Sequence, residues 1–317
     1  MCGEASRPKR VVAWALDPNP FGSLASGFGL QGILTIVSDD QVTIRPLETR
    51  AEYEACVALQ RDIWGRDFMD VVPATILMVS QQVGGVASGA FDAGRLVGFV
   101  FGISGVRDRV TAHWSDMLAV RPEARGRGLG RRLKLHQRER LLAVGIERVY
   151  WTFDPLVARN ARLNLTTLGA SPVEYVSNMY GDTGSRLHRG LDTDRFIVEW
   201  RLRDPAVERR LAGTPARLPA AAREGPIVTL ALAGPAAGAP LDNAAPLPDA
   251  PWVRVELPAD VARLKADAPD LARRWQQSLR RAFTTYLNAR HARVAGVHAD
   301  PDTGRWFYTV DTTGGDS

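Results

Sequence analysis

The segment from Val120 to Arg131 concentrates residues suited to anion chemistry, because four arginines and three glycines follow an apolar run there. Main-chain N–H groups at the start of a helix lack partners within the helix and lie at the positive end of its dipole. Glycine lets a phosphate approach these groups, and arginine adds charge-assisted hydrogen bonds. The segment therefore predicts a loop that binds a phosphorylated ligand.

Two common phosphate-binding loops do not fit this segment. A dinucleotide-binding loop beginning at Gly126 needs its third glycine at position 131, where the chain has Arg131, and no acidic residue closes a following strand. The Lys-Ser/Thr pair of a P-loop is also missing. Both readings are set aside.

The neighbouring patterns predict the elements that position this loop. Thr49 and Glu52 form the pattern of a capping box, which predicts a helix ending near Gly65. The predicted order is strand, two helices, three strands, helix, strand, helix and two strands. These strands are expected at 42–46, 86–91, 95–103, 111–120, 148–153, 172–180 and 195–202, and the helices at 49–65, 73–82, 129–145 and 156–168.

The run from Met117 to Gly130 resembles motif A of the GNAT superfamily of N-acetyltransferases. In that motif an apolar strand and a Val-x-Pro turn lead into Arg/Gln-x-x-Gly-x-Gly/Ala, matched here by Arg125, Gly128 and Gly130. The element order over 42–203 also resembles the GNAT fold, an α/β (α+β) fold with a mixed central sheet flanked by helices. Stretches such as WTFDP and NARLN are similar to a bacterial branch of two-part GNAT proteins.

The resemblance implies where coenzyme A lies, in a cleft between the fourth and fifth strands. Main-chain groups of Leu118 and Val120 are then expected to hold the pantetheine arm and the thioester carbonyl, and Asn160 the pantetheine or adenine part. A tyrosine that often protonates the departing thiolate is replaced by Leu165. The phosphates would be held by Arg125, Gly126, Arg127, Gly128, Leu129, Gly130 and Arg131.

Transfer to an amine requires that the amine lose a proton, so a base that accepts this proton is expected near the acyl group, on the predicted fourth strand. Two-residue alternation places Asp116 on one face with Trp114, Leu118 and Val120, beside the acyl carbonyl. Asp116 is therefore a candidate base, or else it bonds a neighbouring backbone group or arginine. His113 is expected on the opposite face, in a structural role or else as a proton carrier.

Three further side chains are candidates for the acceptor site. Asp154 ends the fifth strand and either anchors a substrate ammonium group or caps the next helix. Tyr180 is a candidate acid for the thiolate, and Arg195 a candidate ligand for a substrate carboxylate. The alternative role for Tyr180 is a core or cross-strand contact.

Composition limits the classes of ligand and partner that the sequence predicts. The net charge is +5, but the arginines are scattered, so a small phosphorylated ligand is expected and nucleic acid is not. The two cysteines, Cys2 and Cys56, suggest neither a disulfide framework nor a metal site. No apolar run is long enough to span a membrane. We expect a cytoplasmic protein, with a homodimer left open.

The remaining chain divides by composition. Residues 1–40 read as a flexible leader, and 212–250 as a linker rich in alanine, proline and glycine. A small α/β module is expected at 251–311, where Trp275, Phe283 and Tyr286 mark the buried face of a helix. The GNAT-like domain is expected at 42–203.

These observations favour an N-acyltransferase that moves an acyl group, expected to be acetyl, from acyl-CoA to the amino group of a small molecule. An amino acid would suit Arg195, and succinyl-CoA is an alternative donor to acetyl-CoA. A non-catalytic acyl-CoA sensor fits the leucine at Leu165. A nucleic-acid or protein-binding module that keeps the fold for its surface is a third alternative, motivated by the basic charge.

Overall fold

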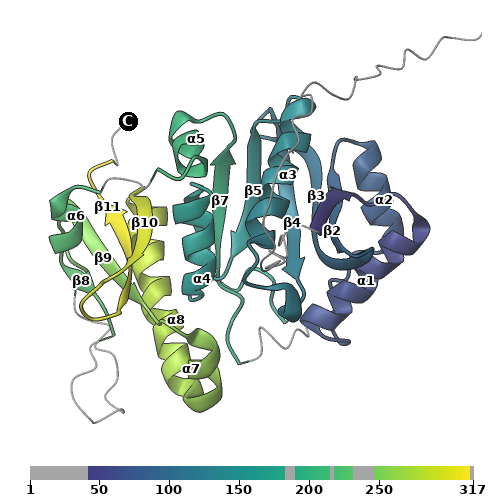
Figure 1. The fold of residues 1–317 in the computed structure, drawn as a ribbon. Helices are drawn as coiled ribbons and strands as arrows, with labels where there is room; N and C mark the ends of the chain where they lie inside the picture. The colour runs from purple at the N-terminus through teal and green to yellow at the C-terminus, as the bar shows by residue number, and fades with distance from the viewer. Residues whose placement is uncertain (1–41, 183–189, 215–217, 231–245, 315–317) are drawn as a thin grey trace, which may run out of the picture. The chain divides into compact units, whose positions relative to one another are not determined.

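The computed structural model describes residues 42–182, 190–214, 218–230 and 246–314. Its main feature is a seven-stranded mixed sheet in the order β1-β2-β3-β4-β5-β7-β6 (Figure 1). Only β4 and β5 run parallel to each other; the other neighbours are antiparallel. The strands are β1 (Val42–Pro46), β2 (Val86–Asp92), β3 (Arg95–Arg107), β4 (Val110–Val120), β5 (Arg148–Phe153), β6 (Ser171–Val176) and β7 (Arg195–Arg201).

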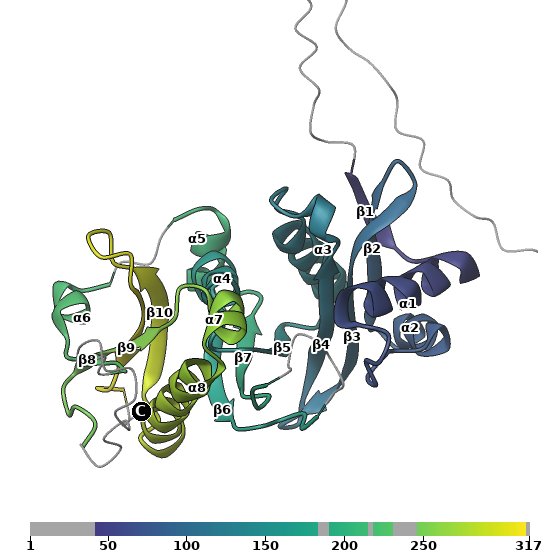
Figure 2. The ribbon, with the colours of Figure 1, turned by 90° about the horizontal axis from the view of Figure 1, so that it is seen from below.

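Helices cover both faces of this sheet (Figure 2). Helices α1 (Arg50–Trp64) and α2 (Ala74–Gln82) pack on one face, where Cys56 and Leu59 meet Phe99 and Met117. Helix α3 (Leu129–Ala143) and α4 (Ala158–Ala161), continued by the π-helical segment η2 (Arg162–Thr167), pack on the other. The predicted mixed sheet flanked by helices is confirmed.

Local sequence signals explain several element boundaries. Thr49 and Glu52 form the predicted capping box, and Gly65 ends α1. The predicted strand 172–180 is too long, because β6 ends at Val176 and Asn178 adopts φ 46°. Within the predicted helix 156–168, only α4 is α-helical. The chain continues from α4 as the π-helical segment η2.

The predicted face alternation along β4 is wrong, because the strand contains a β-bulge. The β3–β4 register passes from Phe101–Met117 to Ile103–Trp114, so Ser115 and Asp116 together oppose one residue of β3. The bulge shifts every later side chain by one position. Leu118 and Val120 therefore pack toward α3, and Trp114 packs in a different cluster on the other face.

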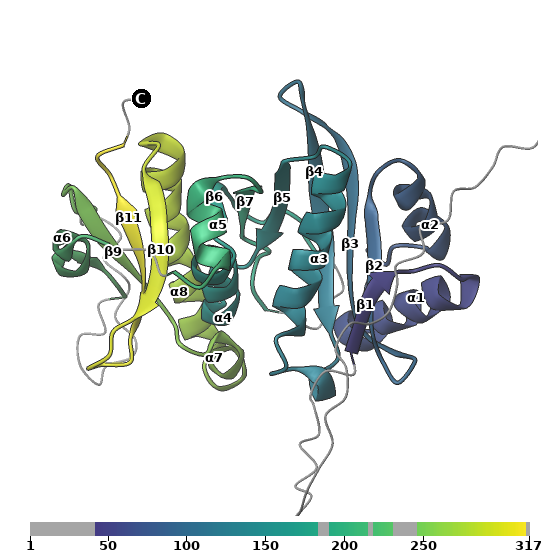
Figure 3. The ribbon, with the colours of Figure 1, turned by 45° about the horizontal axis from the view of Figure 1, so that its top comes forward.

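A second sheet of four strands, in the order β10-β11-β9-β8, follows in the carboxy-terminal region (Figure 3). Its elements are β8 (Ile227–Val228), β9 (Trp252–Leu257), α7 (Val261–Asp267), α8 (Pro269–Phe283), η3 (Thr284–Ala289), β10 (Arg293–Ala299) and β11 (Trp306–Asp311). The aromatic face of α8 and η3 is buried as predicted, including Trp275, Phe283 and Tyr286. This small sheet agrees with the extra module expected from the sequence.

Side chains of the two sheets share one apolar cluster. Phe283 stacks against Tyr175, and its ring centroid lies 4.6 Å from that of Phe196 on β7. The Tyr308 hydroxyl donates a hydrogen bond of 2.7 Å to the carbonyl of Pro155. The described residues between 42 and 314 accordingly form one compact unit by their contacts.

Two stretches between these sheets depart from a plain linker. Helices α5 (Pro205–Leu211) and α6 (Ala220–Glu224) and strand β8 lie in or beside 212–250, and β8 pairs with β9. Residues 231–245 and the predicted leader at 1–40 lie outside the described residues. The division of the chain into two domains stays a prediction.

Candidate functional site

Strands β4 and β5 form a fork. They pair over three positions only, and the last pair is Trp114 with Tyr150. Beyond it, β4 continues for six residues to Val120, and β5 continues to Phe153 alongside β7. An opening between two neighbouring parallel strands thus begins at Ser115 and Trp151.

The β4 edge inside this fork turns main-chain groups toward the diverging β5, and one of them, the carbonyl of Val120, accepts from Arg125. The N–H of Arg121 donates to the carbonyl of Val97 on β3, at 2.8 Å. Strand alternation then turns the main-chain groups of Leu118 and Val120 toward the opposite edge, where β5 has diverged. Leu118 and Val120 are the residues whose main-chain groups the family resemblance implies for the pantetheine arm, and that role stays a prediction.

The glycine-bearing loop after β4 presents the start of α3 to the same region. Gly126 has φ 85° and Gly128 has φ 69°, a left-handed conformation that glycine adopts without strain. Gly128 is the N-cap of α3, no side chain caps this helix end, and its first turn contains no acidic residue. The first N–H groups of α3 are therefore suited to an anionic ligand.

The predicted arginines of this loop point toward protein groups. Arg125 donates to the carbonyl of Val120 at 3.3 Å, and Arg127 pairs with Asp92 at 2.6 Å. Arg131 donates to the carbonyl of Leu211 at 2.8 Å. In this arrangement the main-chain N–H groups and the helix dipole suit an anion, whereas the three arginines contact protein groups.

On the α1 and α2 side of the fork, the residues that are candidates for binding the acceptor lie close enough to affect one another electrostatically. The Tyr180 hydroxyl is 2.9 Å from the hydroxyl of Thr152 on β5, and the Arg195 guanidinium lies 5.5 Å from the Tyr180 ring centroid. Desolvation raises the pKa of Tyr180, and the charge of Asp116 adds to this effect. The fold therefore brings Asp116, Tyr180 and Arg195 together.

Asp116 and Asp154 both have pKa values above the usual range for a carboxyl group. For Asp116 the cause is partial desolvation, with a contribution from the negative charge of Asp70. For Asp154 burial also raises the pKa, although Arg195 opposes it. Asp154 accepts the N–H of Leu156 at 2.8 Å within a turn, but it does not cap the next helix, because the N-cap of α4 is Val157 and no side chain caps it.

The two remaining predicted positions lie on the α4 side. Asn160 is half-buried in α4, and its side chain forms no hydrogen bond within the described part of the chain. Leu165, in place of the tyrosine that the resemblance implies, is buried in the core within η2. It contributes no hydroxyl group to the fork.

A buried polar network on the α3 side was missed by sequence reasoning. Lys134 donates to Ser115 at 2.7 Å, and Gln137 contacts both Ser115 and His113 at 3.0 Å. Burial, with the charge of Lys134, lowers the pKa of His113 to about 3. The available signal was position, because Lys134 and Gln137 lie on the same helical face as Leu133 and Leu141.

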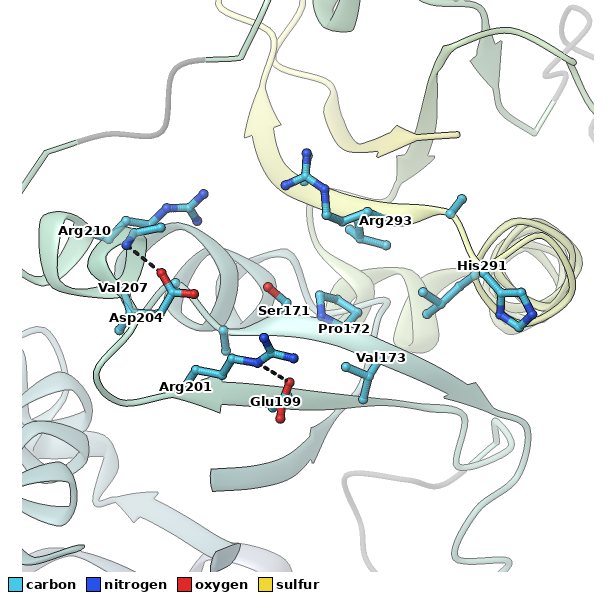
Figure 4. A pocket seen from close by; sticks show the side chains of 17 residues that line it. Ser171, Pro172, Val173, Glu199, Arg201, Asp204, Val207, Arg210, His291 and Arg293 are labelled. Atoms are coloured by element: carbon cyan, nitrogen blue, oxygen red, sulfur yellow. Dashed lines mark hydrogen bonds and ion pairs between the residues drawn. The ribbon is translucent and has the colours of Figure 1, made fainter. Parts of the chain in front are cut away.

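A separate cavity of about 500 Å³ lies between the start of β6, the end of β7, α5 and the start of β10 (Figure 4). Arg201, beside Glu199, and Arg210 and Arg293 line it. Arg210 also donates to the carbonyl of Leu165. The predicted catalytic and cofactor residues do not line this cavity.

The described residues lack both a metal-binding cluster and a membrane-spanning helix. In those ranges no cluster of histidine, cysteine, aspartate or glutamate side chains is arranged to bind a metal ion. None of the helices described there has both the length and the apolar character needed to cross a bilayer.

Comparison with known proteins gives a family for the forked sheet. Residues 49–164 match the acetyltransferase (GNAT) family. No curated protein matches the chain. Similar solved structures include the ribosomal-protein-S18-alanine N-acetyltransferase from Escherichia coli, at 19% identity and a TM-score of 0.40, covering 51% of this chain and 94% of that one.

Two more solved structures show the same level of similarity. An acetyltransferase of the GNAT family from Streptococcus pneumoniae has 19% identity and a TM-score of 0.41, covering 50% of this chain and 98% of that one. A putative acetyltransferase from Salmonella typhimurium, solved with acetyl-CoA, has 17% identity and a TM-score of 0.40, covering 51% and 95%. The family assignment rests on the sequence match alone, which identifies residues 49–164 as an acetyltransferase (GNAT) domain.

Proposed function

We propose that this protein is an N-acetyltransferase that moves the acetyl group of acetyl-CoA to the amino group of a small molecule. The observation that carries the proposal is the edge of β4 that faces β5, which pairs with no strand beyond Trp114 in the described residues and leads from a helix start without a side-chain cap to the β4–β5 fork. The helix start would bind the anionic part of a ligand. The adjoining edge of β4 would form hydrogen bonds with an extended part of the same ligand. The family match over 49–164 supports acetyl-CoA as donor.

The residues present fit coenzyme A. Its pyrophosphate would contact the N–H groups from Gly126 to Gly130, and its pantetheine arm would hydrogen-bond to Leu118 and Val120. The six residues from Ser115 to Val120 span about 20 Å of strand, which lets an extended arm reach the fork. Asn160 would hold a polar group of the same ligand.

The acceptor would enter from the side of Asp116 and Tyr180. A free alkylamine is mostly protonated at neutral pH, so a base that accepts its proton helps the reaction. The raised pKa makes Asp116 a stronger base than an ordinary aspartate. Arg195 would favour an acceptor that carries a carboxylate, such as an amino acid, and Asp154 would attract its ammonium group.

The first experiment is calorimetric titration with acetyl-CoA, succinyl-CoA and free coenzyme A. The variant Gly128→Glu places a strained side chain and a negative charge at the helix start. Gly145→Glu is the matched control, because Gly145 also has positive φ and open space around it but lies at the other end of α3. We expect binding to be lost in Gly128→Glu and retained in Gly145→Glu.

Donor binding in the wild type would then justify a screen of amines, with release of the thiol as readout. The alternative function is an acyl-CoA sensor, which the buried Leu165 favours because it supplies no acid group. Tight binding without thiol release for any amine would support the sensor. Failure to bind all three ligands would contradict both functions.

A further inference from the structure

Lys134 is the least expected residue of the fold, because it is a lysine side chain buried in the sheet–helix core with 2% of its surface exposed. Its ammonium group donates to Ser115 at 2.7 Å and to Gln137 at 3.2 Å, and it lies 3.9 Å from the Trp151 ring centroid. These partners are neutral. No salt bridge joins Lys134 to a carboxylate within the described ranges, so its charge is costly to bury.

The ammonium group lies where the two strands separate. Trp114 and Tyr150 form the last pair between β4 and β5, so Ser115 and Trp151 are the first residues beyond it. Lys134 contacts both of them from α3 and so spans the base of the fork. An extended ligand arm running along β4 from the glycine loop would end at this point, because β5 closes the edge there.

A purely structural role explains this placement poorly. Methionine has a similar volume and could fill the same space without the cost of burying a charge. Ser115 and Gln137 already bond each other at 3.0 Å, so they do not need the lysine as a partner. A reactive role at the base of the fork accounts for both the charge and its position.

We propose that the ammonium group of Lys134 protonates the sulfur of coenzyme A as the thioester breaks, an inference that rests on the proposed function. The acceptor nitrogen forms a bond to the acetyl carbon, and the carbon–sulfur bond breaks. The electron pair of that bond goes to sulfur, which takes a proton from Lys134. The acceptor nitrogen gives up its own proton to Asp116, which releases it to water, and Lys134 regains a proton from water after coenzyme A leaves.

The surroundings of Lys134 suit a group that gives up a proton. Burial lowers the pKa of Lys134 to about 7, so both of its protonation states are accessible near neutral pH. His113, which contacts Gln137, is neutral in this range because its pKa is also lowered by burial. Its other neighbours are Ser115 of β4, Gln137 of α3 and Trp151 of β5, which do not titrate near neutral pH.

Tyr180 is the competing candidate for the proton donor. It lies on the opposite side of β5 from Lys134. Tyr180 contacts Thr152, whereas Lys134 contacts Trp151, and successive residues of a strand point to opposite faces. Lys134→Met and Tyr180→Phe therefore remove one candidate each from opposite sides of β5. Both variants retain a side chain of similar volume.

The experiment measures kcat/KM for an acylated amine, expressed per neutral amine, from pH 6 to 9, together with the Kd for acetyl-CoA. We expect the wild-type value to fall as pH rises above the pKa of Lys134. Lys134→Met should lose this fall, and its kcat/KM at pH 6 should decrease about 100-fold, the lower range for general acid catalysis. Its Kd should change less than about threefold, and Tyr180→Phe should keep the wild-type pH profile.

Three results would overturn the proposal: activity of Lys134→Met within threefold of wild type, an alkaline fall that persists in this variant, or equal losses of catalysis and acetyl-CoA binding. If Lys134→Met does not fold, Lys134→Gln and the wild-type profile decide, and a flat wild-type profile up to pH 9 overturns the proposal. A wild type that neither binds acetyl-CoA nor acylates an amine contradicts the proposed function instead.

Discussion

Replacing Lys134 by methionine should make the folded protein more stable at pH 6, although it removes two hydrogen bonds. The lysine has no anionic partner among the residues described, whereas in the unfolded chain water solvates its charge fully. Methionine removes the charge and keeps the volume. Because Ser115 donates to Gln137 at 3.0 Å, both polar side chains keep a hydrogen bond after the substitution.

The magnitude follows from the pKa of Lys134. A decrease from 10.5 to about 7 corresponds to about 5 kcal/mol that disfavours the folded state when the lysine is protonated in it. Attraction to the Trp151 ring returns about 1–2 kcal/mol of this cost. We therefore expect Lys134→Met to raise the free energy of unfolding by about 3 kcal/mol at pH 6.

The pH dependence tests the reasoning more sharply than the absolute value. Between the folded pKa of about 7 and the unfolded value of 10.5, the unfolded chain binds a proton that the folded chain lacks. Wild-type stability therefore rises with pH in this window, by up to about 1.4 kcal/mol per pH unit relative to the variant. The advantage of Lys134→Met should thus be largest below pH 7 and shrink toward pH 9.

Urea denaturation of both proteins at pH 6, 7, 8 and 9 measures this difference. Arg140→Met, on the exposed surface of the same helix, is the control for a lost positive charge, and its effect should not follow this pH pattern. A stability difference between Lys134→Met and wild type that stays constant from pH 6 to 9 would refute an uncompensated buried ammonium group. So would a variant less stable than wild type at pH 6.

Further predictions concern the acceptor side. Asp116→Asn should lower kcat/KM for the amine about 100-fold with the acetyl-CoA Kd unchanged, measured by thiol release, because the base is lost; a loss below threefold would exclude that role. Arg195→Gln should raise KM for a carboxylate-bearing amine about tenfold but leave that for the matching amide unchanged; equal changes would contradict carboxylate binding. Arg280→Met should lower the free energy of unfolding by about 3 kcal/mol in urea, because buried Asp194 loses a paired cation; an unchanged midpoint and slope would show that this pair does not stabilise the fold.

Local sequence patterns were sufficient for most of the fold. The capping box at Thr49 and Glu52, the hairpin around Ala93 and Gly94, and the glycines before α3 each act over a few residues, so their effect is visible in the sequence. The loop conformation at Gly126 and Gly128 also follows from residue type.

Contacts between distant segments could not be predicted in the same way. The β4 bulge depends on pairing with β3, so simple alternation wrongly placed Leu118 on the same face as Trp114. Lys134 meets Trp151 only after the chain has formed α3 and β5, and neither residue signals the contact alone. Arg131 likewise turns to Leu211, a residue 80 positions away.

The anchoring of the segment before β7 gives the carboxy-terminal module a part in the neighbourhood of Arg195. Arg280 of α8 holds the carboxylate of Asp194 at 2.6 Å, and Arg195 follows directly in sequence. The glycine loop before α3, by contrast, belongs wholly to the forked sheet. If the proposed function holds, donor recognition and acceptor choice depend on different stretches of the chain, so a substitution in α8 is expected to change the acceptor without changing the donor.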